Sequence, residues 1–282
     1  MSTKPTKATA KGRGRAASRL VADKPTVIAA VHPNAGVEAA YRRKLEALID
    51  EMNASLLHWL KASYRANEPH MAADKSPAEL INSAMARLAR RWQARFDQLA
   101  PKLARMFAAQ ATTRTDAAFQ AALRKGGFTV RFEMTPTVRD AYEATLAENV
   151  GLIRSIASEH LTDVQGIVMR SVARGRDLGL LAKELETQFG VPKRRAAFIS
   201  RDQNNKATAV ITAARQKELG ITQARWVHSQ GGKHPRPSHV AASKAGLVYN
   251  VSEGALIDGE RIWPGQLPNC RCVARSIVPG FS

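Results

Sequence analysis

Acidic residues, cysteines and long apolar stretches are all scarce in this 282-residue sequence. No apolar run approaches the roughly 20 residues that a membrane-spanning helix needs. The best candidate for the core of a signal peptide, residues 27–31, is far too short. With only two cysteines, a structural disulfide framework is excluded. We therefore expect a soluble chain of intracellular type without a membrane partner.

The shortage of acidic residues leaves a large positive charge. Only 24 Asp and Glu stand against 43 Lys and Arg, so the formal net charge is +19. A charge of this size indicates a polyanionic partner. Nucleic acid is the first candidate, ahead of an anionic membrane surface or an acidic protein. Hydrophobic residues make up 44% of the chain, enough for a buried core, so disorder of the whole chain is excluded.

Residues 1–26 are predicted to form a disordered basic arm. Small and polar residues separate its cations, and too few apolar side chains are present to offset the entropy of ordering. Such an arm could bind phosphates, or it could be a solvated terminus that helps solubility. The candidate phosphate-binding residues are Lys4, Lys7, Lys11, Arg13 and Arg15.

Residues 27–147 are predicted to be a helical N-terminal region. Apolar residues recur at helical spacing over 37–66, and a second helix is expected from Ser76, where an N-cap precedes proline and glutamate. Pro101 is expected to kink this helix or to begin a new one, and residues 128–132 alternate like a strand. Cations gather on one face of the second helix, which is either solvated or a docking surface for phosphates or an acidic protein: Arg87, Arg91, Arg95, Lys102 and Arg105.

Residues 148–282 are predicted to form an α+β domain. A long helix is expected from residue 150, a short one over 177–189 closed by Gly190 and Pro192, and another over 193–219. Short strands are expected over 223–229, 247–251 and 272–277. The fold class is therefore mostly α, with long N-terminal helices and a small C-terminal α+β portion containing short antiparallel strands.

Histidines and cysteines cluster in the last 60 residues. Imidazole and thiolate are the ligands that zinc prefers, so a tetrahedral site is conceivable. Cys-x-Cys is tighter than the usual knuckle, however, and the sequence favours the cysteines as small buried residues at the start of a strand. We expect no cofactor. If a metal is bound, its ligands are expected to be His234, His239, Cys270 and Cys272.

Catalysis has weak support in the sequence. Cys270 or Cys272 could act as a nucleophile beside His239, and His239 could serve as the base of a nuclease. Neither a nucleophile elbow nor a phosphate loop accompanies them, and the nearby acids are scattered. We expect no enzyme activity. Arg201 is expected to pair with an acid and to hold its helix to the α+β segment.

The order of motifs over residues 148–276 resembles the phage Mu F-like head morphogenesis family. The resemblance depends on Gly220-Ile221 before Trp226, on the Arg236-x-x-His239 motif and on the final Asn269-Cys270-Arg271-Cys272. Many relatives have Cys-x-x-Cys where this chain has residues 236–239, and that pair would complete a zinc site with the terminal cysteines. The residues expected to form the structural motif are Arg201, Trp226, Arg236, His239, Asn269, Cys270 and Cys272.

The resemblance implies a minor capsid protein of a tailed bacteriophage. Proteins similar to it associate with the portal protein, other head proteins and packaged double-stranded DNA, during head assembly or genome ejection. The implied location is the virion interior, and the host cytoplasm during assembly. Nothing in the sequence resembles a base-reading helix, so DNA contact should be independent of sequence.

Two other functions stay open from the sequence. The domain type is sometimes joined to toxin domains such as ADP-ribosyltransferase-like ones, but no such domain is expected here because the sequence ends at Ser282, soon after Cys272. A general DNA-binding protein of the host would also fit the basic face. The family resemblance argues against this alternative.

Overall fold

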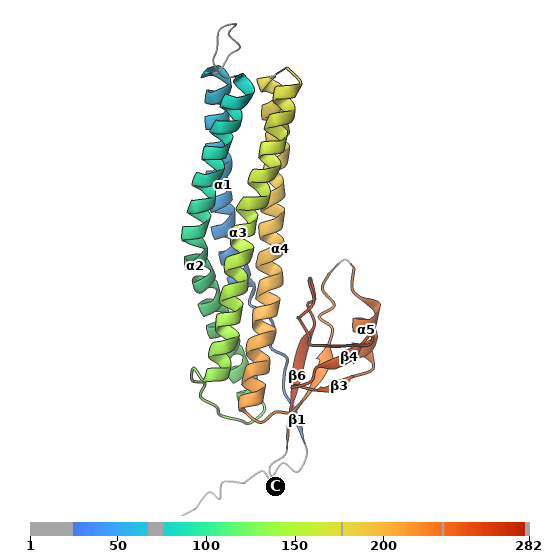
Figure 1. Cartoon of the computed structure of the whole chain (residues 1–282). Helices are drawn as coiled ribbons and strands as arrows, with labels where there is room; N and C mark the ends of the chain where they lie inside the picture. Colours follow the sequence, from blue (N-terminus) through green and yellow to red (C-terminus); the bar gives the residue numbers. More distant parts are fainter. Residues whose placement is uncertain (1–24, 67–75, 176, 233, 280–282) are drawn as a thin grey trace, which may run out of the picture.

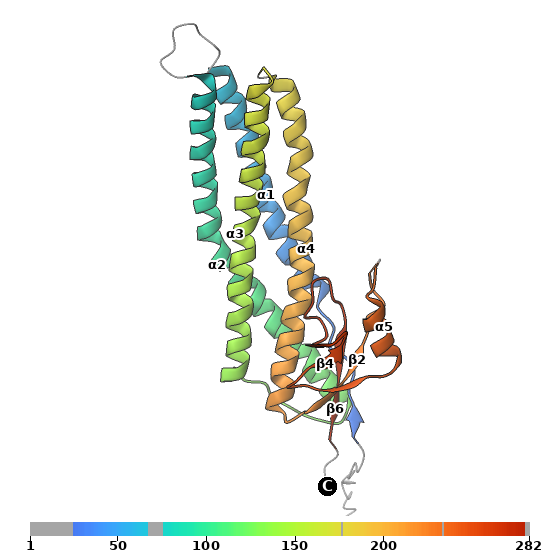
Figure 2. The same ribbon diagram turned by 45° about the vertical axis from the view of Figure 1, so that its right-hand side comes forward.

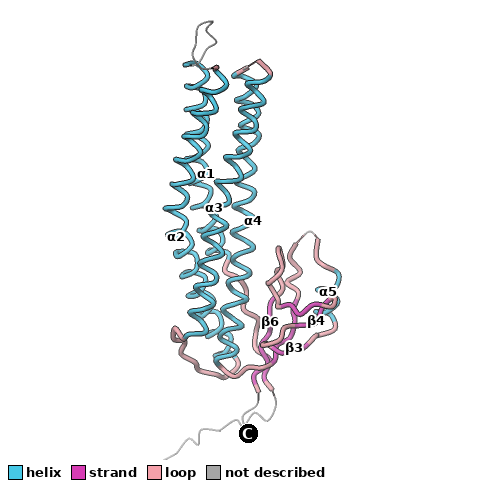
Figure 3. The backbone as a smooth tube through the Cα atoms, viewed as in Figure 1, coloured by secondary structure: helices cyan, strands magenta, loops and turns pink. Residues whose placement is uncertain are grey.

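Four long helices form an antiparallel bundle, and a small sheet packs beside one end of it (Figure 1). The computed structural model describes residues 25–66, 76–175, 177–232 and 234–279. The bundle helices are α1 (Ala35–Ala66), α2 (Pro77–Lys125), α3 (Pro136–Ala173) and α4 (Leu178–Glu218). Figure 3 shows that the long helices and the strands occupy separate parts of the molecule. The predicted class, mostly α with a small C-terminal α+β portion, is confirmed.

Side-chain caps begin three of the bundle helices. Ser76 accepts a hydrogen bond from the backbone of Glu79, and the Glu79 carboxylate bonds back to the Ser76 amide, which completes a capping box. Thr135 and Asp177 cap α3 and α4 in the same manner, each accepting from the amide three residues ahead. These caps satisfy amides that have no partner inside the helix.

Apolar faces of all four helices meet in one continuous core. Residues from α1 and α2 pack with residues from α3 and α4 in a single cluster. The boundary expected between residues 147 and 148 therefore falls inside α3, whose two halves both line the bundle. The largest fully buried side chains of this cluster include Tyr41, Leu45, Met52, Leu56, Phe96 and Phe107.

Two prolines were expected to affect the helices that contain them, and only one of these expectations is wrong. α2 continues through Pro101, although Figure 2 shows that it changes direction along its length. The predicted break at Gly190 and Pro192 is wrong, because α4 is one helix through both residues. Leu185 and Ala196, on either side of that point, are both fully buried in the bundle. Packing of this face stabilises α4 by more than the local cost of the proline.

The C-terminal strands form a four-stranded antiparallel sheet in the order β1-β6-β2-β3. Its strands are β1 (Thr26–Val27), β6 (Val273–Val278), β2 (Gln223–Val227) and β3 (Val248–Asn250). A hairpin of β4 (Ala255–Ile257) and β5 (Glu260–Ile262) and the short helix α5 (Pro237–Lys244) lie beside it. The three predicted strands are present, each within two residues of its expected ends.

The first strand was not expected from the sequence. β1 pairs with the last strand, with Thr26 opposite Val278. The chain then leads Ile28 and Val31 into a small core beneath the sheet. Of the basic arm expected over residues 1–26, residues 1–24 lie outside the described residues, so its cations are not placed.

The strand expected over residues 128–132 is wrong. This segment is extended but joins neither sheet. Its alternating apolar residues instead pack against Phe119 and Leu123 near the end of α2. The alternating pattern indicated which side chains are half-buried, but it does not predict whether the backbone has a neighbouring strand to pair with.

Buried polar groups connect helices across the bundle. The Tyr41 hydroxyl donates to Asn149, and Asn149 donates in turn to Gln203, so α1, α3 and α4 are joined. The Nε2 atom of His160 is hydrogen-bonded to Asn53 at 2.8 Å, and its buried Nδ1 atom has no partner among the described residues. Burial lowers the pKa of His160 to about 4, so its ring is neutral at pH 7.

None of the described helices combines the length and the apolar character needed to cross a bilayer.

Candidate functional site: a histidine–cysteine cluster in a basic cavity

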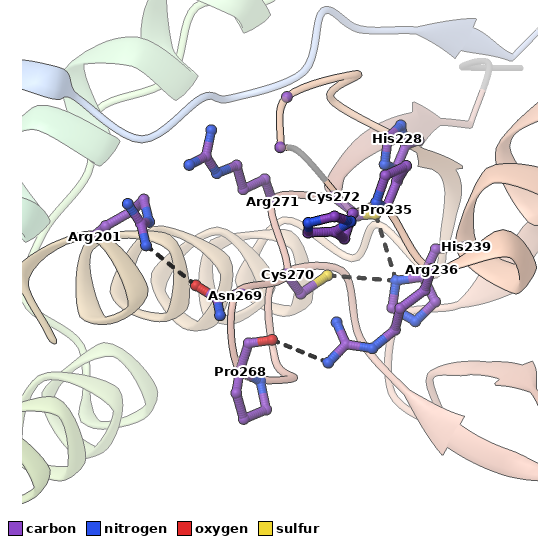
Figure 4. Close-up of a pocket in the computed structure, with 13 residues that line it drawn as sticks. Arg201, His228, Pro235, Arg236, His239, Pro268, Asn269, Cys270, Arg271 and Cys272 are labelled. Atoms are coloured by element: carbon purple, nitrogen blue, oxygen red, sulfur yellow. Dashed lines mark hydrogen bonds between the residues drawn. The ribbon is translucent and has the colours of Figure 1, made fainter. Parts of the chain in front are cut away.

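A cavity of about 790 Å³ lies where the N-terminus of α5 and the turn before β6 approach α4 (Figure 4). Arg201 of α4 lines one side, and Arg236 at the start of α5 lines another. The loop after β2, the first turn of α5 and the turn before β6 supply the other lining residues, which are His228, Gly231, Gly232, His234, Pro235, His239, Pro268, Asn269, Cys270, Arg271 and Cys272.

Three potential metal ligands meet on the inner wall of this cavity. The Nδ1 atom of His239 lies 3.6 Å from the Sγ of Cys270 and 3.6 Å from the Sγ of Cys272. All three side chains are buried, and their ligand atoms lie within 4.8 Å of one another. The sequence predicted this juxtaposition only through the resemblance, because the histidine and the cysteines are thirty residues apart.

The two thiols titrate as a coupled pair. The hydrogen bond from Cys272 lowers the pKa of the Cys270 thiol to about 5. The same hydrogen bond, together with burial, raises the pKa of Cys272 above its usual range. The two pKa values therefore shift in opposite directions, because the two thiols share one hydrogen bond.

The cluster is held by rigid neighbours. Trp226 is fully buried, and its ring stands edge-on to the His239 ring with centroids 5.0 Å apart. The Gly265 amide donates to the Cys270 sulfur at 3.4 Å. Gly265 has φ of +84°, and an added Cβ would lie 3.0 Å from the Ala209 methyl group on α4. This position therefore requires glycine, for both backbone conformation and close approach.

A carboxylate on α4 fixes the turn that carries the cysteines. Asp202 accepts a hydrogen bond from the Asn269 amide at 2.7 Å and pairs with Lys206 at 3.2 Å. Asn269 itself has φ of +59°, which asparagine tolerates better than most residues. Arg201, which was expected to pair with an acid, instead donates to the Asn269 side chain at 3.4 Å. No role was predicted for Asp202 from the sequence, although it follows Arg201 directly.

The geometry of the cluster fits zinc. Zn–S bonds of about 2.3 Å and Zn–N bonds of about 2.0–2.1 Å at tetrahedral angles place N and S about 3.6 Å apart. The two nitrogen–sulfur separations in the structure match that value. The Nε2 atom of His239 is buried and has no partner among the described residues. His234, the fourth expected ligand, lines the same cavity but is not part of the close cluster.

The other predicted site residues lie in two separate parts of the structure. Arg201, Arg236 and Asn269, which were expected in the structural motif, lie around the cavity, and Arg236 donates to the Pro268 carbonyl at 3.1 Å. Arg271 also lines the cavity, although the sequence indicated no role for it beyond its place between the two cysteines. The basic face of α2 is separate from this cavity, and its cations are exposed: Arg87, Arg91, Arg95, Lys102 and Arg105.

The protein combines a helical bundle, a small antiparallel sheet and a buried cluster of one histidine and two cysteines. Residues 162–275 match the family described as "Phage Mu protein F like protein". This match confirms the Mu F-like resemblance for that segment, and the segment includes the last part of α3, all of α4 and the whole cavity.

A protein of Haemophilus influenzae described as uncharacterized is similar to part of this chain. The two are 36% identical over 139 residues, which is 49% of this chain and 30% of the relative. The chain therefore spans about a third of the length of the curated relative that it matches. No solved structure matches the chain significantly.

Proposed function

We propose that this chain is a minor head protein of a tailed bacteriophage that acts without catalysis, bound to the portal and to packaged DNA. The match of residues 162–275 to the Mu F-like family carries the proposal. The charge of +19 supports a polyanionic partner inside the head. The location that follows is the virion interior, with assembly in the host cytoplasm.

The exposed face of α2 is the part of the bundle best suited to DNA. At 100° per residue its five cations fall within about 80° of the helix circumference, and they extend over about 27 Å. Only Arg95 among the five has an ion pair in the described structure, with Glu51 at 3.5 Å. Four cations are thus left for phosphates, and none sits on an element shaped to read bases.

A hydrophobic anchor beside this face supports contact with a protein. Trp59 on α1 is 47% exposed. With Arg87 and Arg91 it lines a cavity of about 300 Å³ between α1 and α2. Exposed tryptophan flanked by arginine is the composition of protein-binding hot spots. We assign Trp59 to contact with the portal or another head protein, and the cations of the α2 face to DNA.

Mass spectrometry of purified, nuclease-treated heads from a producing strain tests the proposal. We expect peptides of this chain at a few to some tens of copies per head. Peptides found only in the lysate would contradict residence in the head and would favour the alternative functions, an effector enzyme or a host DNA-binding protein.

We further propose that His239, Cys270 and Cys272 hold one zinc ion that stabilises the C-terminal domain. The match between their separations and tetrahedral zinc geometry supports this role. The fourth position faces the cavity, where His234 or water could complete the coordination.

The chain purified without chelator should contain about one zinc per molecule by elemental mass spectrometry. Replacing His239 by Ala should reduce the content to a small fraction, because two ligands cannot retain the ion. His58→Ala, at an exposed position on α1, is the matched control and should leave the content unchanged. A wild-type chain that neither contains zinc nor takes it up from solution would contradict the assignment.

A further inference from the structure

The cavity in front of the cysteines has an unusual charge. Three arginines and three histidines line it, and none of the described residues that line it is acidic. Figure 4 shows Arg201, Arg236 and Arg271 arranged around Cys270. Cationic side chains that line one cavity raise its positive potential, which favours the binding of an anion there. Asp202, which follows Arg201 on α4, is bonded to the Asn269 amide and paired with Lys206.

The three arginines have spare hydrogen-bonding capacity. In the described structure none of them forms an ion pair, and Arg201 and Arg236 each donate to a neutral oxygen. The Nε atom of Arg201 is buried and has no hydrogen-bond partner among the described residues. Arg271 reaches back over the glycine-rich loop, where its Nη1 would lie 3.2 Å from a Cβ at Gly231. A guanidinium has five N–H donors, so most of these donors remain for a ligand.

The N-terminus of α5 adds positive potential on the same side. Arg236 occupies the N-cap position without making a side-chain capping bond, and Arg236 and His239 both line the cavity. Unsatisfied amides at a helix N-terminus favour anions, above all phosphate. Planar arginine forks favour the same group because they bond two oxygens at once.

We propose that this cavity binds a phosphate-bearing ligand of nucleotide size, with the phosphate between Arg201, Arg236 and Arg271. The volume of about 790 Å³ is larger than one phosphate needs and lies within the usual range for small-ligand sites of roughly 300–1,000 Å³. The phosphate can belong to a free nucleotide or to the end of a nucleic acid strand. This site is separate from the basic face of α2 and stands without the head-protein role.

Isothermal titration calorimetry on the full chain in 50 mM salt tests the site. The probes are inorganic phosphate, 5′-deoxyadenosine monophosphate, a 5′-phosphorylated single-stranded hexanucleotide, and deoxyadenosine as the control without phosphate. We expect the monophosphate to bind and deoxyadenosine not to bind. Tighter binding of the hexanucleotide than of the monophosphate would identify a strand end as the ligand, and the reverse would identify a free nucleotide.

Arg271→Gln is the decisive variant, because the Arg271 side chain makes no hydrogen bond recorded in the described structure and should be removable without unfolding. A lost charge-assisted contact to phosphate should weaken binding by roughly ten- to hundredfold. Arg271→Lys, which keeps the charge but loses the fork, should fall between Arg271→Gln and the wild type.

Two controls separate this cavity from general charge effects. Arg139→Gln removes the same charge from an exposed position on α3 and should leave the affinity unchanged. A chain with Arg87, Arg91 and Lys102 changed to Gln should bind the monophosphate as the wild type does. The proposal is overturned if no phosphate-bearing probe binds, or if Arg271→Gln weakens binding no more than Arg139→Gln.

Discussion

Replacing Arg215 by Met should lower the free energy of unfolding by about 3–5 kcal/mol. Arg215 is 2% exposed, and its guanidinium makes two bonds to Asp116 on α2, at 2.9 and 2.7 Å. It also donates to the Glu133 carbonyl at 2.6 Å and to Glu218 at 2.9 Å. One side chain thus joins α4 to α2 and to the segment before α3. Methionine fills similar volume but leaves two carboxylates and a carbonyl without their donor.

Urea denaturation at pH 7 measures this loss. Arg42→Met is the matched control, because Arg42 is half-exposed and pairs only with Glu46 one turn along α1. That change should cost no more than about 0.5 kcal/mol. Adding Asp116→Asn to Arg215→Met should restore part of the stability, since it removes one uncompensated carboxylate. Similar losses for Arg215→Met and Arg42→Met would contradict a structural role for the buried arginine.

Binding of the full chain to double-stranded DNA should weaken by roughly 10³–10⁵ between 50 and 200 mM salt, if six to ten cations contact phosphates. The face of α2 and the basic arm, whose cations lie outside the described residues, together contain enough cations for that number. Fluorescence anisotropy with duplexes of two unrelated sequences checks both the salt dependence and the expected lack of sequence preference.

The same measurement tests whether the α2 face contacts DNA. Changing Arg87, Arg91 and Lys102 to Gln should reduce the slope of log K against log salt by about 3, because each lost contact removes about one unit. The control changes Arg43, Arg139 and Arg170 to Gln, which removes equal charge from exposed positions on α1 and α3. Equal slopes for the two triple variants would show that DNA does not contact the α2 face.

Local signals predicted most of the helices and the main strands. Ser76, Thr135 and Asp177 start helices where their side chains can cap amides, and this chemistry is legible in a few residues. Helix ends were harder to predict from the local sequence. Gly190 and Pro192 have the composition of a helix end, yet both lie inside α4 because long-range packing outweighs local propensity.

The candidate site could be anticipated only in part. The residue types of His239, Cys270 and Cys272 indicated possible ligands, and a resemblance to a family placed them in one motif. The His239 Nδ1 atom lies 3.6 Å from each sulfur because α5 is placed beside the turn before β6. Asp202 and Arg271 received no role from the sequence, although Arg271 lies between the two cysteines of the motif, because residue type alone does not reveal a distant partner.

By itself the sequence determined the charge of the protein, the helical class of its larger part and the residue types available for metal or phosphate, because composition and periodicity are local properties. Only the tertiary structure decided that β1 pairs with the last strand, that Arg215 joins three segments and that three arginines share a cavity with the cysteines. These contacts join residues that are tens to hundreds of positions apart. They form only when the apolar faces of four helices have found one another, and no short stretch of sequence contains that information.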